Sequence, residues 1–368
     1  MEISMRKFPA TVDRSGADQI LLNLLRNQVK SSILEALNGA RSCSLVGFPN
    51  HNNSGDSAIW LGERAILREL GVRVNYVCDD ASYSPQDLRK HTSNADPILI
   101  HGGGNYGDLW PQQQAFREAV LSNHGNRSIV QLPQTLDFRN RASAEEHRKL
   151  LARRTGPFLL LCRDDESLRL AKDELSTEAA LCPDPAFSLS TNSQPSPTHD
   201  VVLNLRTDHE TSSIPVPNLE PLRVRTVDWF DTPPSRRTLR RVTVRVRTHV
   251  RALASAVSSD DFIGERVRRG PTLGADFFAA RRVQNALRML SSGRVVVTDR
   301  LHGHILATLL GIPHVVLDTR SRKIARFHKT FTRNSNITLV AATTVEVPKL
   351  AAKLLERMSE GVGEELKF

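Results

Sequence analysis

Two short segments bring together side chains that can bind anions or move protons. Residues 298–304 read TDRLHGH, which places Arg300 and His302 directly after an apolar run. A guanidinium can hold a phosphate or carboxylate through two parallel hydrogen bonds, and an imidazole can exchange a proton near neutral pH. Residues 102–108 read GGGNYGD. Three successive glycines allow the backbone to approach either a ligand or a packed helix closely.

Three further segments carry weaker signals of the same kind. Residues 49–57 read PNHNNSGDS, with Asn53 and Asp56 beside a glycine. CRDDES (162–167) contains Arg163, and NLRTDHE (204–210) contains Arg206 and Asp208. Each segment also has a plain structural interpretation, as a polar connection with a helix cap or as a solvated turn.

The elements that must position these side chains alternate between strands and helices. Short apolar runs such as CSLVGF, ILIH, FLLLC, VVLNL and RVVVT are each followed by a polar segment and a helical pattern. This alternation predicts parallel sheets covered by helices. The candidate segments follow strands and precede helices, and helix N-termini at the carboxyl ends of strands bind anions.

A change of composition divides the chain. Residues 188–200 are rich in Ser, Thr, Pro and Asn, which indicates a linker. We therefore expect an N-terminal α/β domain at 1–190 and a C-terminal α/β domain at 200–345, which carries the NLRTDHE and TDRLHGH segments. A final helix at 346–368 is expected to pack back on the body. The predicted fold class is α/β, with two Rossmann-like domains facing a cleft.

The net charge of the chain indicates which classes of binding partner to expect. The formal net charge of +10 favours an anionic partner, whether a phosphorylated small molecule, a membrane surface or nucleic acid. The Arg-rich stretch 223–251 has no assigned role, and we expect no nucleic acid because that function leaves the strand-end segments unexplained. The N-terminus has no apolar stretch of signal-peptide length, so we expect a cytoplasmic protein, with peripheral contact at the inner face of an anionic membrane as an addition.

Several common chemistries are not indicated. The Gly102, Gly104 and Gly107 pattern resembles a dinucleotide fingerprint, but no acidic residue ends the next strand. The sequence contains neither a P-loop nor a serine nucleophile elbow. The cysteines are scattered, and His302 with His304 lacks the spacing of a helical metal pair, so we expect no metal.

Taken in order, these segments resemble the polysaccharide pyruvyl transferase family. The matching segments are GFPNHNNSGDSAIWLGERAILRELG, ILIHGGGNYGDLWP, QLPQT, CRDDES, LNLRTDHE and VVVTDRLHGHILATLLGIPHVVLD, between about residues 43 and 331. The resemblance implies a glycosyltransferase-B-like architecture. It implies transfer of the pyruvyl group of phosphoenolpyruvate, as co-substrate and with no other cofactor, to two sugar hydroxyls. The product is a cyclic ketal, and phosphate is released. Exopolysaccharide repeat units, glycolipids and lipid-linked glycans are the implied acceptors.

The resemblance also implies roles for particular residues. It implies that the donor is bound by Arg300, Leu301 and His302, by an arginine matched to Arg206 or else to Arg163, and by an aspartate matched to Asp108 or else to Asp56. From the chemistry, we expect His302 to move protons and Arg300 with Arg206 to hold the phosphate and carboxylate.

The remaining candidates serve the acceptor and the glycine segment. We expect Asp108 or Asp208 to act on the acceptor hydroxyls. Donor contacts through the backbone are expected at Gly102, Gly103, Gly104 and Asn105, and acceptor or loop candidates are Asn53, Asp56 and His304. The alternative function is a glycosyltransferase of the same architecture that uses a nucleotide sugar.

Overall fold

The structure is a computed structural model. It describes the backbone of residues 16–191, 194–206, 218–229, 262–319 and 321–364, and the side chains of these residues except 262–273 and 360–364. Two compact units are present. We call Leu25–Leu189 with Phe230–Val283 the N-terminal unit, and Met1–Leu24, Ser190–Trp229 and Gln284–Phe368 the C-terminal unit. Helices α1 (Gly16–Leu37) and α8 (Phe262–Ser291) each contribute residues to both units.

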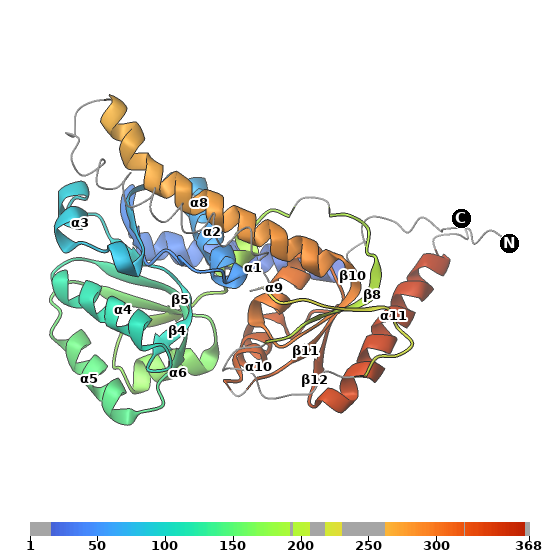
Figure 1. The fold of residues 1–368 in the computed structure, drawn as a ribbon. Helices are drawn as coiled ribbons and strands as arrows, with labels where there is room; N and C mark the ends of the chain where they lie inside the picture. Colours follow the sequence, from blue (N-terminus) through green and yellow to red (C-terminus); the bar gives the residue numbers. More distant parts are fainter. Residues whose placement is uncertain (1–15, 192–193, 207–217, 230–261, 320, 365–368) are drawn as a thin grey trace. The chain divides into compact units, whose positions relative to one another are not determined.

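The N-terminal unit is built on a parallel sheet of seven strands (Figure 1). Along the sheet the order is β2 (Arg73–Cys78), β1 (Ser42–Val46), β3 (Ile98–Ile100), β5 (Ile129–Asp137), β6 (Phe158–Cys162) and β7 (Ala179–Leu181). A further strand, β4 (Gly103–Gly107), pairs with β5.

Helices cover both faces of this sheet because its strands are apolar on both sides. Leu45 of β1 packs with α1 and α2 (Ser54–Glu69), whereas the next residue, Val46, packs with the opposite layer. That layer contains α3 (Pro85–His91), α4 (Pro111–Asn123) and α5 (Arg141–Ala152). Helix α6 (Asp165–Asp173) follows β6. The alternation along β1 is the period of two that directs successive side chains to opposite faces.

The C-terminal unit contains a second parallel sheet, of five strands. Its order is β12 (Thr338–Ala341), β11 (His314–Leu317), β10 (Gly293–Thr298), β8 (His199–Asn204) and β9 (Val224–Thr226). Helix α11 (Val347–Glu364) belongs to the core of this unit through Val347, Ala351 and Leu354. Figure 1 shows α9 (Leu301–Leu310) and α10 (Lys323–Phe327) on the other side of the sheet.

Both sheets reverse their strand order at one point. In each unit the second strand of the chain lies on one side of the first, and the third strand lies on the other side. The crossovers therefore diverge between β1 and β3, and again between β8 and β10. In open parallel sheets, ligands bind outside the carboxyl ends of the strands at this switch point. The topology thus selects the residues after Val46 and Ile100, and those after Asn204 and Thr298.

The predicted α/β class with parallel sheets is confirmed, and two local expectations are corrected. The glycine segment is not wholly a loop, because residues 103–107 form β4. Gly107 makes this pairing possible: its φ is +127°, and a Cβ there would overlap the carbonyl of Asp137. Helix α2 begins at Ser54, inside the 49–57 segment that was expected to precede the helix, because Asn53 caps it by accepting a hydrogen bond from Gly55. Residues 230–251 of the Arg-rich stretch 223–251 lie outside the described residues.

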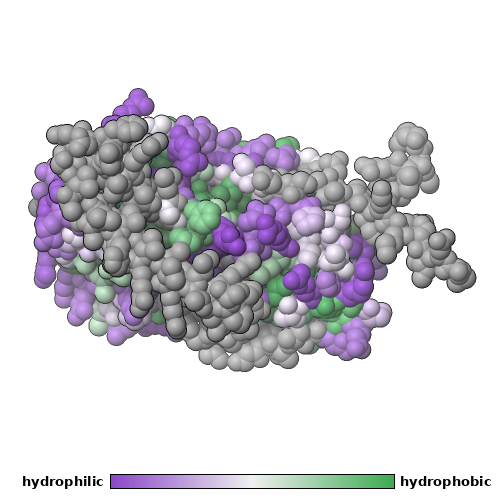
Figure 2. All heavy atoms as spheres, turned by 45° about the horizontal axis from the view of Figure 1, so that its top comes forward, coloured by the Kyte–Doolittle hydropathy of each residue, from purple (hydrophilic) through white to green (hydrophobic). Residues whose placement is uncertain are grey.

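On the face shown in Figure 2, hydrophilic residues are interspersed with smaller apolar areas. No helix among the described residues has both the length and the apolar character needed to cross a membrane. Likewise, the described part of the chain contains no group of three or more His, Cys, Asp or Glu side chains arranged to hold a metal ion.

Candidate active site

In the C-terminal unit, the first turn of α9 is fixed directly against the ends of β8 and β10. The Thr298 hydroxyl donates to the carbonyl of Asn204 (2.8 Å) and accepts from the backbone N–H of Arg300 (3.1 Å). Gly303 permits this close approach, because a Cβ at that position would overlap the Thr298 hydroxyl. The positive end of the α9 dipole is therefore held at the switch point, where it favours an anion.

Arg300 lies at the N-cap of α9 and is held in one orientation. Its Nη2 is 3.0 Å from Oδ1 of Asp228, and the side chain is 5% exposed. The guanidinium also lies 6.0 Å from the ring centre of Trp229. Asp228 and Trp229 follow β9, so a segment distant in sequence orients the arginine at the strand ends.

Asp299 joins the two strand ends through the backbone. Its Oδ1 accepts the N–H of Arg206 at 2.8 Å. Burial raises the pKa of Asp299 to about 6, although the Arg206 hydrogen bond and the Arg300 charge act in the opposite direction. The structure thus brings Arg206, Asp299 and Arg300 together. Asp208, expected on the same segment as Arg206, lies outside the described residues.

The remaining residues of the TDRLHGH segment have different environments. Leu301 and His302 are buried in the first turn of α9, at 7% and 9% exposure. Nδ1 of His304 lies 2.7 Å from Nε2 of His314, and its Nε2 lies 2.9 Å from the Thr332 hydroxyl. Because both ring nitrogens of His304 are used within the core, we no longer assign this residue to the acceptor.

At the switch point of the N-terminal unit, a buried carboxylate binds the residues that follow β3. Oε2 of Glu63 lies 2.8 Å from Nδ1 of His101, and Oε1 accepts the N–H of Gly102 at 2.8 Å. Burial alone would lower the pKa of His101, but the charge and hydrogen bond of Glu63 leave it raised. The Gly102 N–H is therefore engaged by the protein.

The glycine segment is shaped by amide side chains of the QLPQT motif. Gln134 accepts the N–H of Asn105 (3.2 Å) and donates to Oδ1 of Asn105 (3.1 Å) and to the carbonyl of His101 (3.2 Å). Gln131 donates to the same carbonyl at 3.0 Å.

Arg117, on α4, holds the side chains of Gln131 and Asn105 in place. It donates to Oε1 of Gln131 (2.8 Å) and to Oδ1 of Asn105 (2.9 Å), and its guanidinium lies 4.2 Å from the ring centre of Tyr106. The Oδ1 of Asn105 is therefore occupied by protein donors. Gly103 and Gly104 lie in β4.

The first polar segment forms the beginning of α2. Asn53 caps the helix, and its amide nitrogen donates to Oδ2 of Asp56 at 2.9 Å. The Asp56 carboxylate is 22% exposed and lies 3.5 Å from Nε2 of His51. A Cβ at Gly103 would stand 3.9 Å from Oδ1 of Asp56, so the first segment and the glycine segment are neighbours.

Arg163 is placed at the end of β6 and is paired inside the unit. Its Nη1 is 2.7 Å from Oδ2 of Asp184, and its Nε donates to the Thr135 hydroxyl at 2.9 Å. The negative charge of Asp184 also acts to raise the pKa of His101. Arg163 therefore belongs to the same strand-end cluster as the Glu63–His101 pair.

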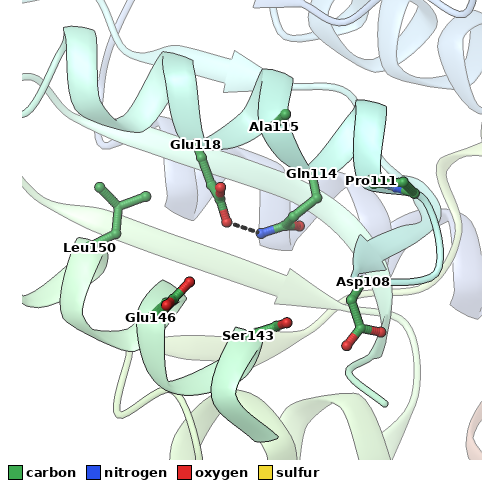
Figure 3. A pocket seen from close by; sticks show the side chains of 8 residues that line it. All are labelled: Asp108, Pro111, Gln114, Ala115, Glu118, Ser143, Glu146 and Leu150. Carbon is green, nitrogen blue, oxygen red and sulfur yellow. Dashed lines mark hydrogen bonds between the residues drawn. The ribbon is translucent and has the colours of Figure 1, made fainter. Parts of the chain in front are cut away.

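Asp108 is separate from this cluster. Its carboxylate accepts the N–H groups of Arg139 (2.9 and 3.1 Å) and Asn140 (2.7 Å), which fixes the segment before α5. Figure 3 shows Asp108 at the rim of a pocket between α4 and α5, of about 290 Å³, with Glu118 and Glu146 also in its wall. The carboxylate is thus used in positioning the backbone.

Sequence reasoning missed several residues of these two strand-end clusters. Glu63 and Arg117 lie in helical patterns with no spacing that singles them out, and Asp228 lies in none of the matching segments. His101 had a detectable signal, because it ends an apolar strand and precedes three glycines. The functional interpretation of that segment rests on the glycines alone.

Comparison with known proteins identifies the family. The model of the polysaccharide pyruvyl transferase family matches residues 53–321. Pyruvyl transferase 1 of Schizosaccharomyces pombe is 30% identical over 336 residues, covering 86% of this chain and 76% of the yeast protein. EpsO of Bacillus subtilis is 28% identical over 313 residues, covering 83% of this chain and 89% of that protein.

A crystal structure of an uncharacterized protein from Klebsiella pneumoniae shares the fold, with a TM-score of 0.56 and 17% identity over 87% of this chain and 99% of that one. This likeness is consistent with the Rossmann-like character of both units, while their arrangement around a cleft stays a prediction. The family match covers most of the chain and both strand-end clusters. The chain belongs to the polysaccharide pyruvyl transferase family and is a transferase.

Proposed function

We propose that this enzyme transfers the pyruvyl group of phosphoenolpyruvate to two hydroxyls of a glycan acceptor, forming a cyclic ketal and releasing phosphate. The observation that carries the proposal is the position of Arg300. It stands at the N-terminus of α9, 5% exposed, oriented by Asp228 and beside the end of β8. A donor with a phosphate and a carboxylate on the same carbon suits this combination of guanidinium and helix dipole.

The donor anions have two sources of positive charge in the C-terminal unit. Arg300 and Arg206 follow β10 and β8, whose last residues Thr298 and Asn204 are direct partners in the sheet. The backbone N–H groups in the first turn of α9 add the helix dipole. We assign the phosphate and the carboxylate to these groups jointly.

The reaction requires proton transfers that balance. The methylene carbon of the donor gains one proton, which creates an oxocarbenium-like centre at the neighbouring carbon. Two acceptor hydroxyls form C–O bonds there and lose two protons, and the C–O bond to phosphate breaks. One of the two hydroxyl protons compensates for the proton that the methylene carbon gained in becoming a methyl group. The other is taken up by the departing phosphate. His302, in the first turn of α9, is the residue to which we assign the proton for the methylene carbon.

The acceptor side is assigned more narrowly than the sequence suggested. The Asp108 carboxylate is already bonded to two backbone N–H groups, and both nitrogens of His304 are used in the core. His304 therefore has no ring nitrogen left for a sugar hydroxyl, and the Asp108 carboxylate holds the backbone before α5. Asp208, outside the described residues, stays the candidate for that role.

Direct binding tests the donor. Calorimetric titration of the full chain with phosphoenolpyruvate, UDP-glucose and GDP-mannose should give heat with phosphoenolpyruvate alone. Arg300→Ala should weaken that binding by roughly ten- to a hundredfold, because a charge-assisted hydrogen bond is lost. Arg300→Lys should restore only part of it, since an ammonium lacks the fork geometry.

A matched control separates this effect from loss of net charge. Arg223 also pairs with an aspartate, Asp200, but lies at the amino end of the sheet and is 67% exposed. Arg223→Ala should leave donor affinity unchanged. Binding of a sugar nucleotide in place of phosphoenolpyruvate would make glycosyl transfer the function. With the donor established, free and lipid-linked glycans can be compared by phosphate release.

A further inference from the structure

The C-terminal unit holds a buried hydrogen-bond donor beside Arg300 that the proposed function does not yet use. This donor is the indole nitrogen of Trp229, a side chain that is 5% exposed. Its Nε1 is buried and has no hydrogen-bond partner among the described residues. An indole nitrogen can only donate, so this conclusion does not depend on a tautomer, an amide orientation or a protonation state. Buried tryptophan N–H groups usually have a partner, so this one requires an explanation.

Trp60 shows the usual arrangement in the same chain. This residue is fully buried in the N-terminal unit, and its Nε1 donates to Oδ1 of Asp276 at 2.8 Å. The two indoles are alike in burial, but only that of Trp60 is hydrogen-bonded within the described part of the protein. Of this pair, the N–H of Trp229 is therefore the one available to a ligand.

The backbone places Trp229 at the carboxyl end of the sheet. Leu203 is paired in register with Thr226, and the N–H of Val227 donates to the Leu203 carbonyl at 2.9 Å. The chain therefore continues beside the end of β8, and Trp229 follows two residues later. All of these residues belong to the C-terminal unit. Trp229 thus lies at the same edge of the sheet as Arg300.

Arg300 determines which chemistry this donor can serve. Its Cζ lies 6.0 Å from the centre of the Trp229 ring, and its Nη2 is 3.0 Å from Oδ1 of Asp228. A guanidinium that is already paired with a carboxylate attracts an anion less strongly than one without a counter-ion. A neutral N–H beside it adds a directed hydrogen bond to that anion and brings no further counter-ion. The two groups together therefore suit an oxyanion, whose several oxygens can accept from both.

We propose that the indole N–H of Trp229 donates a hydrogen bond to the oxyanion that Arg300 binds, a phosphate or a carboxylate. Trp229 is then a binding residue, and its neighbour Asp228 is the positioning residue that orients the guanidinium. The naming of phosphoenolpyruvate as the source of the oxyanion rests on the proposed function. The role of the indole requires only that an oxyanion binds at Arg300.

The experiment records the indole N–H signals of the full chain in two-dimensional ¹H–¹⁵N spectra. The chain has three tryptophans, and Trp229→Phe and Trp60→Phe identify the signals of two of them. Inorganic phosphate, pyruvate and phosphoenolpyruvate are then added separately to the wild type. The Trp229 signal should move downfield because its proton gains an acceptor, and the Trp60 signal should stay in place. Movement with phosphate or with pyruvate shows which oxyanion the site takes.

Calorimetric titration with the same three anions measures the contribution of the hydrogen bond. Trp229→Phe keeps an aromatic ring beside Arg300 and removes the donor. It should weaken binding by roughly tenfold or more, the loss expected for a hydrogen bond to a charged group. Trp60→Phe is the matched control, because it makes the same change in the N-terminal unit and removes an N–H that Asp276 accepts. It should lower stability and leave the affinity unchanged.

The outcomes separate this inference from the proposed function. If phosphate moves the Trp229 signal and phosphoenolpyruvate does not bind, the role of the indole stands and the assignment of phosphoenolpyruvate falls. If phosphoenolpyruvate binds equally to the wild type and to a folded Trp229→Phe chain, while Arg300→Ala weakens it, the proposed function stands and the role of Trp229 is refuted. A wild-type Trp229 signal that none of the three anions moves also refutes that role, and this result needs no folded variant.

Discussion

Acidification should destabilise the C-terminal unit through one buried pair of histidines. Nδ1 of His314 lies 2.8 Å from the carbonyl of Ile312, which can only accept, so this nitrogen carries a proton. Its Nε2 must then accept from Nδ1–H of His304, and Nε2 of His304 must accept from the Thr332 hydroxyl. Both rings are neutral, and a second proton on either would place a charge in the buried core and force this chain of hydrogen bonds to reverse.

The size of the effect follows from the pKa values. Burial lowers the pKa of His314 from 6.5 to about 4, and burial also lowers that of His304 well below its usual value. The unfolded chain therefore takes up protons first as the pH falls. Stability is fully present above pH 6.5 and is lost as the pH falls toward 4. Because one pKa unit corresponds to about 1.4 kcal/mol, His314 alone should remove roughly 2 kcal/mol between pH 8 and pH 5.

Urea unfolding of the wild type and of His314→Gln from pH 8 to pH 5 measures this contribution. Other groups titrate in the same range, and Asp299 does so with the opposite sign because its pKa is raised. The informative quantity is therefore the difference between the two proteins. The variant should lose less stability than the wild type by about 2 kcal/mol. His199→Gln, at a partly exposed position, should follow the wild type. Parallel curves for the wild type and His314→Gln would refute the assignment of neutral, bonded rings.

Two further substitutions test the strand-end geometry and the role of Asp108. Gly303→Ala should lower the free energy of unfolding by about 1–3 kcal/mol, because the new methyl group overlaps the Thr298 hydroxyl, whereas Gly274→Ala, where nothing lies within 4 Å, should be neutral or stabilising in urea unfolding. Asp108→Ala should lower it by about 1–2 kcal/mol through loss of its backbone bonds and leave the calorimetric affinity for phosphoenolpyruvate unchanged. A stable Asp108→Ala chain with severely reduced turnover would return this residue to the reaction.

The fold could be predicted to the level of its elements because apolar strands and helical patterns are local signals. The apolar runs RVVVT and ILIH predict buried strands. The residues that follow them were correctly expected at the strand ends. Strand order is not a local signal. Nothing in the sequence alone shows that β1 lies between β2 and β3, and this order is what makes both switch points.

The candidate site was predictable where chemistry and position coincide in one segment. Arg300 and His302 satisfy both conditions. Partners distant in sequence could not be foreseen: Asp228 orients Arg300 across 72 positions, and Glu63 binds His101 across 38. The sequence does not distinguish an aspartate that bonds backbone N–H groups, as Asp108 does, from one that serves a substrate.

The buried guanidinium of Arg117 bears on how this protein can be engineered. It links α4 to the GGGN segment through Asn105 and Gln131, and Gln134 completes the connection. The backbone conformation of the GGGN segment therefore depends on three side chains that lie outside it, those of Arg117, Gln131 and Gln134. If only the glycines were transplanted onto another scaffold, the segment would not be expected to keep its backbone conformation. A graft that also includes Arg117, Gln131 and Gln134 would carry the hydrogen bonds that hold that conformation.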